Sequence, residues 1–302
     1  MAEAFIAPLG DRGVATLSGP DAAKLLNGLV TNEVARLPEG EAAHAGLLSP
    51  QGKILFDFLA LRTAEGFLLD VAREKAADLV KRLGMYKLRA AVAIADVSDR
   101  YDVWGMWGDD AATVGAAPNR TRGGIVFRDP RHAGMGARIF TARAAADDVP
   151  AALNARLGRA GDYHAHRIVL GVPEGGKDYD FGDAYPHEAD FDLFNGVSFT
   201  KGCYVGQEVV SRMQHKTVVR KRVVRITGES ALAPGAEVTV KGAVIGRTGS
   251  VDGRSALAMI RLDRYVEFIN AHEDVLAGAT RIHVGDADMA RYAACVAARE
   301  KA

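Results

Sequence analysis

The sequence predicts an α+β fold followed by a small C-terminal β-barrel, and three features support this. Strand-like and helix-like segments interleave over roughly the first hundred residues, without the long β-α-β series of a doubly wound sheet. Residues 171–194 are dense in Gly, Pro and Asp, which predicts a long ordered loop. After about residue 220, short strand candidates separated by turn residues indicate a barrel or a sandwich. We therefore expect an α+β region in residues 1–220 and a barrel in residues 221–302.

The first predicted elements are a short strand, Val14–Leu17, and a helix. Pro20 suits the first position of that helix, and Asp21 lies in its first turn, where the helix dipole favours an acid. The apolar residues that follow have helical spacing and form one face. They are Ala22, Leu25, Leu26, Leu29 and Val30.

A hairpin and a second helix come next. Residues 46–48 and 54–61 are predicted to pair as strands, joined by the turn Ser49-Pro50-Gln51-Gly52-Lys53. Phe67–Val71 is a further strand candidate. A helix is expected from about Glu74 to Leu83, and residues 91–94 return as a strand.

The middle of the chain predicts short strands around Trp104 and at residues 125–127, then a small helix at residues 149–157. On a strand, His164 and His166 would share one face and could in principle bind a metal ion. The sequence offers no evident third ligand. We therefore expect ordinary core or surface histidines here and predict no metal site.

Composition and charge exclude several classes of protein. The 302 residues hold 38 Lys and Arg against 38 Asp and Glu, so the formal net charge is zero and direct nucleic-acid binding is not expected. The first residues do not have the pattern of a signal peptide, and no apolar run reaches the roughly 18 residues of a membrane helix. With only two cysteines, a disulfide framework is not expected, and a reducing cytoplasm fits best.

The cysteine count also limits any iron–sulfur chemistry. A 4Fe–4S cluster normally takes four thiolates, whereas Cys203 and Cys295 are two and lie far apart in the sequence. If such chemistry is involved, the chain either assists it or binds a cluster jointly with a partner. Cys295 lies in an alanine-rich segment, and we interpret it as structural.

The segment with the strongest chemical signal is residues 197–212. A strand-like stretch leads to Lys201-Gly202, and Gln207 onward has the composition of a helix, so Cys203 is expected at or just before a helix N-terminus. The helix dipole and the nearby Lys201 ammonium would both lower the pKa of the thiol and raise its reactivity. Glycines at 202 and 206 could allow the backbone to approach a ligand. The alternative is an unreactive buried cysteine.

This segment resembles the K-G-C-Y-x-G-Q-E signature of the YgfZ-type folate-binding proteins, bacterial relatives of a mitochondrial iron–sulfur assembly factor. The resemblance extends almost from end to end, through residues 18–32, 48–53, 167–173 and 186–189. The motif positions are occupied by Lys201, Gly202, Cys203, Tyr204, Gly206, Gln207 and Glu208, with Val205 in the variable position.

The family shares its fold with the T-protein of the glycine cleavage system, an aminomethyltransferase that uses tetrahydrofolate. This GcvT-like fold implies two interwoven α+β domains around a folate pocket, then a C-terminal β-barrel. The T-protein places an aspartate near the reactive folate nitrogen, in a G-G-I-L-D-D-like strand. The matching residues here end in Phe56-Asp57, so one acid is replaced. The T-protein also lacks a cysteine at the position of Cys203, and both departures favour a YgfZ-type protein.

The resemblance further implies a bound tetrahydrofolate or derivative. Its pterin ring needs an apolar or aromatic wall and an acid or amide, and its glutamate tail needs a cation. Tyr163 is the candidate for stacking, Glu188 and Glu208 for the pterin donors, and Arg212 for the tail. The alternatives are an ordinary half-buried strand residue for Tyr163, a locally bonded loop carboxylate for Glu188, and a solvated helix face for Arg212.

Three functions follow as hypotheses. The first is a folate-binding accessory factor in which Cys203, assisted by Lys201, acts in assembly or repair of iron–sulfur clusters, with iron–sulfur enzymes or cluster carriers as partners. The resemblance implies that tRNA-modifying enzymes are among the dependent proteins. The second is a tetrahydrofolate-dependent one-carbon transferase with Asp57 as general base. The third is a scaffold in which neither the thiol nor the folate pocket is used.

Overall fold

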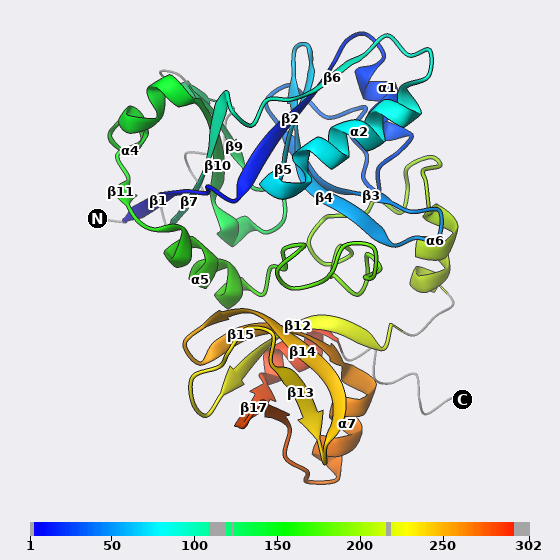
Figure 1. The fold of residues 1–302 in the computed structure, drawn as a ribbon, viewed down its shortest axis with the longest axis vertical. Helices are drawn as coiled ribbons and strands as arrows, with labels where there is room; N and C mark the ends of the chain where they lie inside the picture. Colours follow the sequence, from blue (N-terminus) through cyan, green and yellow to red (C-terminus); the bar gives the residue numbers. More distant parts are fainter. Residues whose placement is uncertain (1–2, 109–118, 122–123, 216–218, 293–302) are drawn as a thin grey trace.

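The computed structural model describes residues 3–108, 119–121, 124–215 and 219–292, and Figure 1 shows two β-sheets side by side above a smaller barrel. Cys295 lies outside the described residues, so its predicted structural role stays a prediction. Within the described part of the chain, no helix is both long and apolar enough to span a bilayer.

The first sheet has five strands in the order β3-β4-β5-β2-β6, with antiparallel pairing throughout. Helix α1 (Ala22–Asn27) and helix α2 (Ala76–Lys87) bury Leu26, Leu79 and Leu83 in the same apolar core as this sheet. The predicted hairpin and both helices are confirmed. The strands are β2 (Arg12–Ser18), β3 (Ala42–Leu48), β4 (Ile54–Thr63), β5 (Gly66–Ala72) and β6 (Ala93–Asp96).

The second sheet has six strands in the order β11-β1-β7-β10-β9-β8. Its strand β1 is followed directly by β2, which belongs to the first sheet, so the chain enters one half of the region and crosses at once into the other. The strands are β1 (Ala4–Pro8), β7 (Tyr101–Gly108), β8 (Asn119–Thr121), β9 (Gly124–Arg128), β10 (Ala137–Ala142) and β11 (Arg156–Leu157).

In the middle of the chain, one predicted element is shorter than expected and one segment has a different secondary structure. The small helix α4 (Val149–Ala152) ends earlier than expected, and the chain then adds β11 in parallel beside β1. The segment expected as a strand around Tyr163 is helix α5 (Ala160–Leu170). Its first turn is stabilised by Asp162, whose Oδ2 accepts a hydrogen bond from the Arg159 amide at 2.9 Å, and Gly171 ends it in a left-handed conformation.

The predicted long loop is confirmed, and it leads through the Cys203 segment to helix α6 (Gln207–His215). A closed barrel follows, with strand order β12-β15-β14-β13-β16-β17. Its parts are β12 (Lys221–Gly228), β13 (Glu237–Val240), β14 (Ala243–Asp252), β15 (Ser255–Arg261), α7 (Leu262–Asn270), β16 (Leu276–Ala277), β17 (Thr280–Val284) and α8 (Asp286–Arg291). Helix α7 was not predicted, although its buried Leu262 and Tyr265 lie at helical spacing.

Buried ion pairs hold the two sheets together. Arg12 of β2 donates from Nε to Oδ1 of Asp70 on β5 at 2.6 Å, and Arg138 of β10 lies 3.1 Å from the other oxygen of Asp70. Arg138 also contacts Asp129 at 3.4 Å, and both acids are at most 2% exposed. Since an unpaired buried charge is very unfavourable, the Arg138–Asp70 pair, which joins β10 of the second sheet to β5 of the first, stabilises the relative position of the two sheets.

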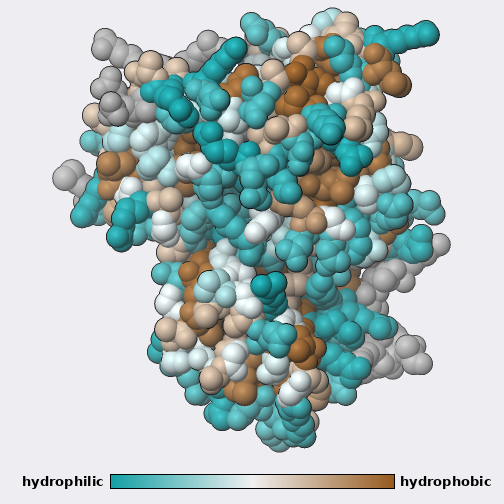
Figure 2. Space-filling view, viewed as in Figure 1, coloured by the Kyte–Doolittle hydropathy of each residue, from teal (hydrophilic) through white to brown (hydrophobic). Residues whose placement is uncertain are grey.

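A second buried pair joins helix α5, the long loop and the barrel. Arg167, which is fully buried, donates to Oδ2 of Asp178 at 2.5 Å and to Oγ of Ser250 at 2.6 Å. The Ser250 amide in turn donates to Oδ1 of Asp178 at 2.8 Å. Figure 2 shows the barrel as a narrower lobe below the sheets, with mostly hydrophilic residues along the junction in this view.

Candidate functional site

Cys203 lies on the surface, in the loop that precedes α6. It is a free, exposed thiol between the buried side chains of Lys201 and Tyr204. Helix α6 begins at Gln207, directly after the turn at 205–206, which confirms the expected position of Cys203 just before a helix. The strand expected to lead to Lys201 is wrong: residues 197–200 form no strand, and the Ser198 amide donates instead to the Thr31 carbonyl at 3.0 Å. An exposed thiol on an ordered loop is available to a partner, unlike the buried cysteine of the alternative interpretation.

Lys201 has partners that the sequence did not suggest. Its Nζ donates to three backbone oxygens, those of Asn27 and Val30 at 2.6 Å and that of Asn32 at 2.9 Å. An ammonium has three N–H groups, so all of them are directed at carbonyls of the segment that ends α1. Burial lowers the pKa of Lys201 to about 8, which leaves the amine charged at neutral pH.

The C-terminal end of the same loop is held against the β3–β4 hairpin. Gly206 has φ +81°, and a Cβ there would lie 2.6 Å from the carbonyl oxygen of Ser49. Gly52 of the hairpin is similarly close to Val209 of α6. Gly206 therefore allows close approach of the loop to the hairpin, and the predicted approach to a ligand stays a prediction. At Gly202, a Cβ would meet nothing within 4 Å.

Tyr204 completes the packing of the motif. Its ring is 8% exposed and belongs to an apolar cluster with Leu48 and Ile54, and burial raises the pKa of its hydroxyl to about 12. The Lys201 ammonium lies 5.1 Å from the ring centroid. Two of the motif side chains thus face inward and support the loop, while Cys203 faces solvent.

Asp57, the candidate general base, is buried in β4 at 7% exposure. Its Oδ2 accepts hydrogen bonds from the Tyr179 hydroxyl at 2.6 Å and from the Gly175 amide at 3.2 Å. Its Oδ1 is buried and has no hydrogen-bond partner among the described residues. The carboxylate is therefore enclosed by the long loop, with one acceptor atom unused.

The four predicted folate contacts do not come together. Tyr163 is 1% exposed, its hydroxyl accepts from Arg131 at 3.0 Å, and Gly105 lies directly against its ring. Glu188 accepts from the Tyr185 amide at 2.9 Å, within its own turn. Glu208 and Arg212 pair with each other at 3.8 Å on the solvent face of α6, with side chains 92% and 58% exposed.

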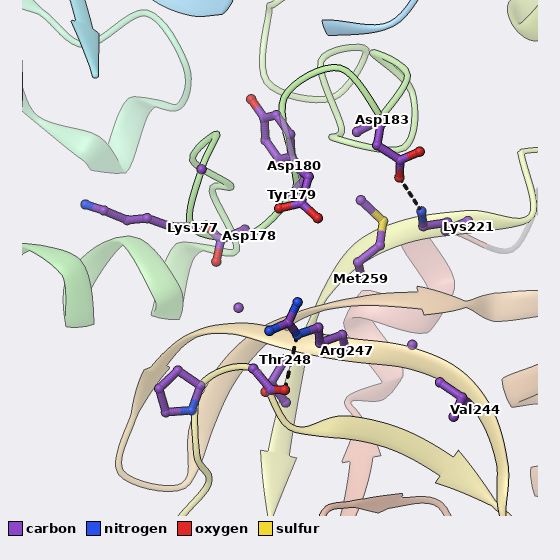
Figure 3. A pocket seen from close by; sticks show the side chains of 16 residues that line it. Lys177, Asp178, Tyr179, Asp180, Asp183, Lys221, Val244, Arg247, Thr248 and Met259 are labelled. Carbon is purple, nitrogen blue, oxygen red and sulfur yellow. Dashed lines mark hydrogen bonds and ion pairs between the residues drawn. The ribbon is translucent and has the colours of Figure 1, made fainter. Parts of the chain in front are cut away.

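A cavity of about 400 Å³ lies elsewhere, between the long loop and the barrel. Tyr179, Asp180, Lys221, Arg247 and Met259 are among its lining residues, together with Lys177, Asp178, Asp183, Val244 and Thr248. In Figure 3, Met259 and Arg247 point from the barrel toward the loop, and Asp180 points toward the barrel. The dense Gly, Pro and Asp content of the loop marked this segment in the sequence, whereas no sequence pattern singled out Lys221 and Arg247 as cavity residues.

The two histidines of α5 diverge, because residues two apart on a helix do not share a face. His164 Nε2 accepts from Lys177 at 3.0 Å, and His166 donates to the Gly134 carbonyl at 2.8 Å. In the described part of the chain, no group of three or more His, Cys, Asp or Glu is arranged to hold a metal ion.

Comparison with known proteins gives two matching domains. The GCVT N-terminal domain matches residues 11–120, and the C-terminal beta-barrel domain of CAF17 matches residues 220–292. The human mitochondrial iron–sulfur cluster assembly factor IBA57 is 36% identical over 83% of this chain and 76% of its own length. The mouse protein is 38% identical over 84% and 76%. This chain belongs to the IBA57 family.

The fold of this IBA57-family chain is also that of an aminomethyltransferase. The glycine cleavage system aminomethyltransferase T from Bartonella henselae superposes with a TM-score of 0.73 at 16% identity, over 94% of this chain and 86% of that one. The predicted GcvT-like fold, with its C-terminal barrel, is confirmed. The expected relation to a mitochondrial iron–sulfur assembly factor is confirmed as well.

Proposed function

We propose that this chain is an accessory factor for iron–sulfur cluster assembly or repair, and that Cys203 is its reactive group. The observation that supports this best is the exposed thiol on a loop fixed at Lys201 on one side and at Gly206 on the other. A thiolate held in a fixed position can ligate a cluster without first ordering its loop. Membership of the IBA57 family is consistent with this role.

Cys203 would act together with a partner. A cluster takes several thiolate ligands, and the whole sequence contains two cysteines. One thiol from this chain can complete a site whose other ligands come from a carrier or client protein. The bacterial YgfZ branch, tRNA-modifying clients and a cytoplasmic location are parts of this proposal that derive from the sequence resemblance and the cysteine count.

The test is complementation in cells that lack this gene, with methylthiolation of tRNA by an iron–sulfur enzyme measured by mass spectrometry of nucleosides. We expect the wild-type chain to restore methylthiolation and Cys203→Ala to lose at least about nine-tenths of it, because alanine cannot ligate iron. Arg264→Ala, on an exposed pair of α7, is the control and should match wild type. Full restoration by Cys203→Ala would contradict the role of the thiol and favour a scaffold.

Tetrahydrofolate is the second part of the proposal, and the cavity between the loop and the barrel fits its chemistry. Tyr179 and Met259 give an apolar wall for the pterin, Asp180 an acceptor for its amino group, and Lys221 and Arg247 cations for the tail carboxylates. Tyr179 also links the cavity to Asp57, whose Oδ1 is unused. Bound tetrahydrofolate would supply a carrier for one-carbon units, the chemistry on which the alternative transferase function depends.

Calorimetric titration with tetrahydrofolate tests this site. We expect Arg247→Ala to weaken binding about tenfold or more, because a charge-assisted hydrogen bond to a carboxylate contributes about 1.5–3 kcal/mol. Arg264→Ala again serves as the control. No binding to the wild-type chain, or equal affinity in wild type and Arg247→Ala, would show that tetrahydrofolate does not bind in this cavity.

A further inference from the structure

The ammonium of Lys201 occupies a cradle of three peptide oxygens that come from a segment about 170 residues earlier in the chain. The Nζ–O distances are 2.6 Å to Asn27, 2.6 Å to Val30 and 2.9 Å to Asn32. The side chain is 8% exposed, and burial penalises its charge. The three short contacts compensate for the water that the ammonium has lost.

The position of the cradle explains why it attracts a cation. Helix α1 ends at Asn27, and the last carbonyls of a helix lack partners within the helix. The helix dipole adds partial negative charge at this end, and Glu33 nearby has the same sign. A primary ammonium suits this cradle, because it offers one N–H to each oxygen.

Further hydrogen bonds show that the cradle is part of a larger interface between residues 27–32 and residues 195–201. Thr31 donates from Oγ1 to the Gly196 carbonyl at 2.6 Å, and Asn32 donates to the Asn195 carbonyl at 2.7 Å. The Ser198 amide donates to the Thr31 carbonyl at 3.0 Å. The chain from 195 to 201 is thus bound along the segment that follows α1, and Lys201 is the last contact before Cys203.

We propose that Lys201 is a positioning residue, and that the three carbonyls form a site specific for a primary ammonium ion. Lys201 clamps the loop at the end of α1 so that Cys203 projects from a fixed backbone. In this proposal it does not donate a hydrogen bond to the Cys203 thiolate, because its three N–H groups are already used, and the alternative is that its charge acts on the thiolate as a counterion. The functional importance of the clamp rests on the proposed function, whereas the cradle itself does not.

The clamp is tested by truncating the Lys201 side chain and adding its missing ammonium group back as a small ion in solution. Lys201→Ala lacks a fragment that propylammonium reproduces, and tetramethylammonium has the same charge without any N–H. We expect amide hydrogen exchange in residues 198–206 to become about tenfold faster or more in Lys201→Ala. Propylammonium should slow it again, whereas tetramethylammonium at equal ionic strength should not. Unchanged exchange, or equal rescue by both ions, would overturn the cradle.

The counterion alternative is tested by the pH dependence of Cys203 alkylation with iodoacetamide. An ammonium beside a thiolate lowers the thiol pKa by about 1–3 units, so its loss would raise that pKa by as much. We expect the midpoint of the rate profile to stay within about 0.3 units in Lys201→Met, which keeps the buried stem and removes the donors. A rise of a full pH unit in this midpoint would contradict the clamp and show that Lys201 acts as the counterion of the Cys203 thiolate.

Both measurements use the isolated protein, so their outcome is independent of the proposed function. Lys201→Met is also the second variant if Lys201→Ala does not fold, with hydrogen exchange of the same loop as the measurement. If the exchange and alkylation results agree with the clamp while Cys203→Ala complements fully in cells, the proposed function fails and the cradle stands. If Cys203→Ala fails to complement but loop exchange is unchanged in Lys201→Met, the cradle fails alone.

Discussion

At the scale of single residues, two glycines of one motif have different reasons to be glycine. Gly206 is in a left-handed conformation, and a side chain there would meet the Ser49 carbonyl. Gly202 has open space around it and lies next to the exposed Cys203. The first glycine is required by the packing of the loop on the hairpin, whereas the fold places no such requirement on the second.

This difference gives a prediction with an internal control. We expect Gly206→Ala to lower the free energy of unfolding by about 2 kcal/mol or more, because it adds both backbone strain and a contact of 2.6 Å with a carbonyl oxygen. Gly202→Ala should stay within about 0.5 kcal/mol of wild type. Urea unfolding followed by circular dichroism measures both. Equal stability of the two variants would show that the loop is not held against the hairpin.

At the scale of elements, two buried histidines connect the long loop to its neighbours. His44 of β3 donates from Nδ1 to the Phe194 carbonyl at 3.0 Å, and His187 of the loop donates from Nε2 to Gln214 of α6 at 2.9 Å. Burial lowers the pKa of both imidazoles below the ordinary value of 6.5. The folded protein therefore keeps them neutral where the unfolded chain binds protons.

The sign of the resulting pH dependence follows directly. Below about pH 6.5 the unfolded chain takes up protons at these positions and the folded protein does not, so stability falls as the pH falls. We expect wild type to lose about 1 kcal/mol more for each of the two histidines, between pH 7.5 and 5.5, than a variant lacking both. Urea unfolding at the two pH values measures the difference.

The matched variant is His44→Asn with His187→Gln, since each amide can replace the donor nitrogen in use. Burial raises the pKa of Asp190 to about 7, so the folded protein binds a proton there before the unfolded chain does, and this group adds stability as the pH falls below 7. Asp190 is present in both proteins, so its effect cancels in the comparison. The same loss of stability in wild type and in the double variant would mean that other groups cause the acid sensitivity.

At the scale of the whole molecule, buried charges join the parts of the fold. Arg138 and Arg167 are the largest fully buried side chains in the described part of the chain, and each contacts an acid from another element. One pair connects the two sheets, and the other connects α5 to the loop and, through Ser250, to the barrel. Separating either buried pair would leave unpaired charges in the interior, which is very unfavourable, so both contacts favour one arrangement of the parts that they join.

The sequence by itself determined the elements whose signals are local. Alternating apolar residues and the Ser49–Lys53 turn were enough to predict the hairpin, and the helical spacing of Ala22, Leu25 and Leu26 was enough to predict α1, because their stabilising contacts lie within a few residues. The helix that begins just after Cys203 was predicted for the same reason, whereas the strand expected before it does not form. Helix α5 was missed because its polar side chains, Arg167 among them, have partners that are distant in sequence.

Only the tertiary structure decided what the predicted site residues do. It gave Lys201 three carbonyls 169 to 174 residues away, enclosed Asp57 under Tyr179, and placed Glu208 and Arg212 in solvent. It also formed a cavity from loop and barrel residues that no motif connects. Local patterns report backbone conformation, whereas hydrogen-bond partners and burial depend on which distant segments the fold brings together.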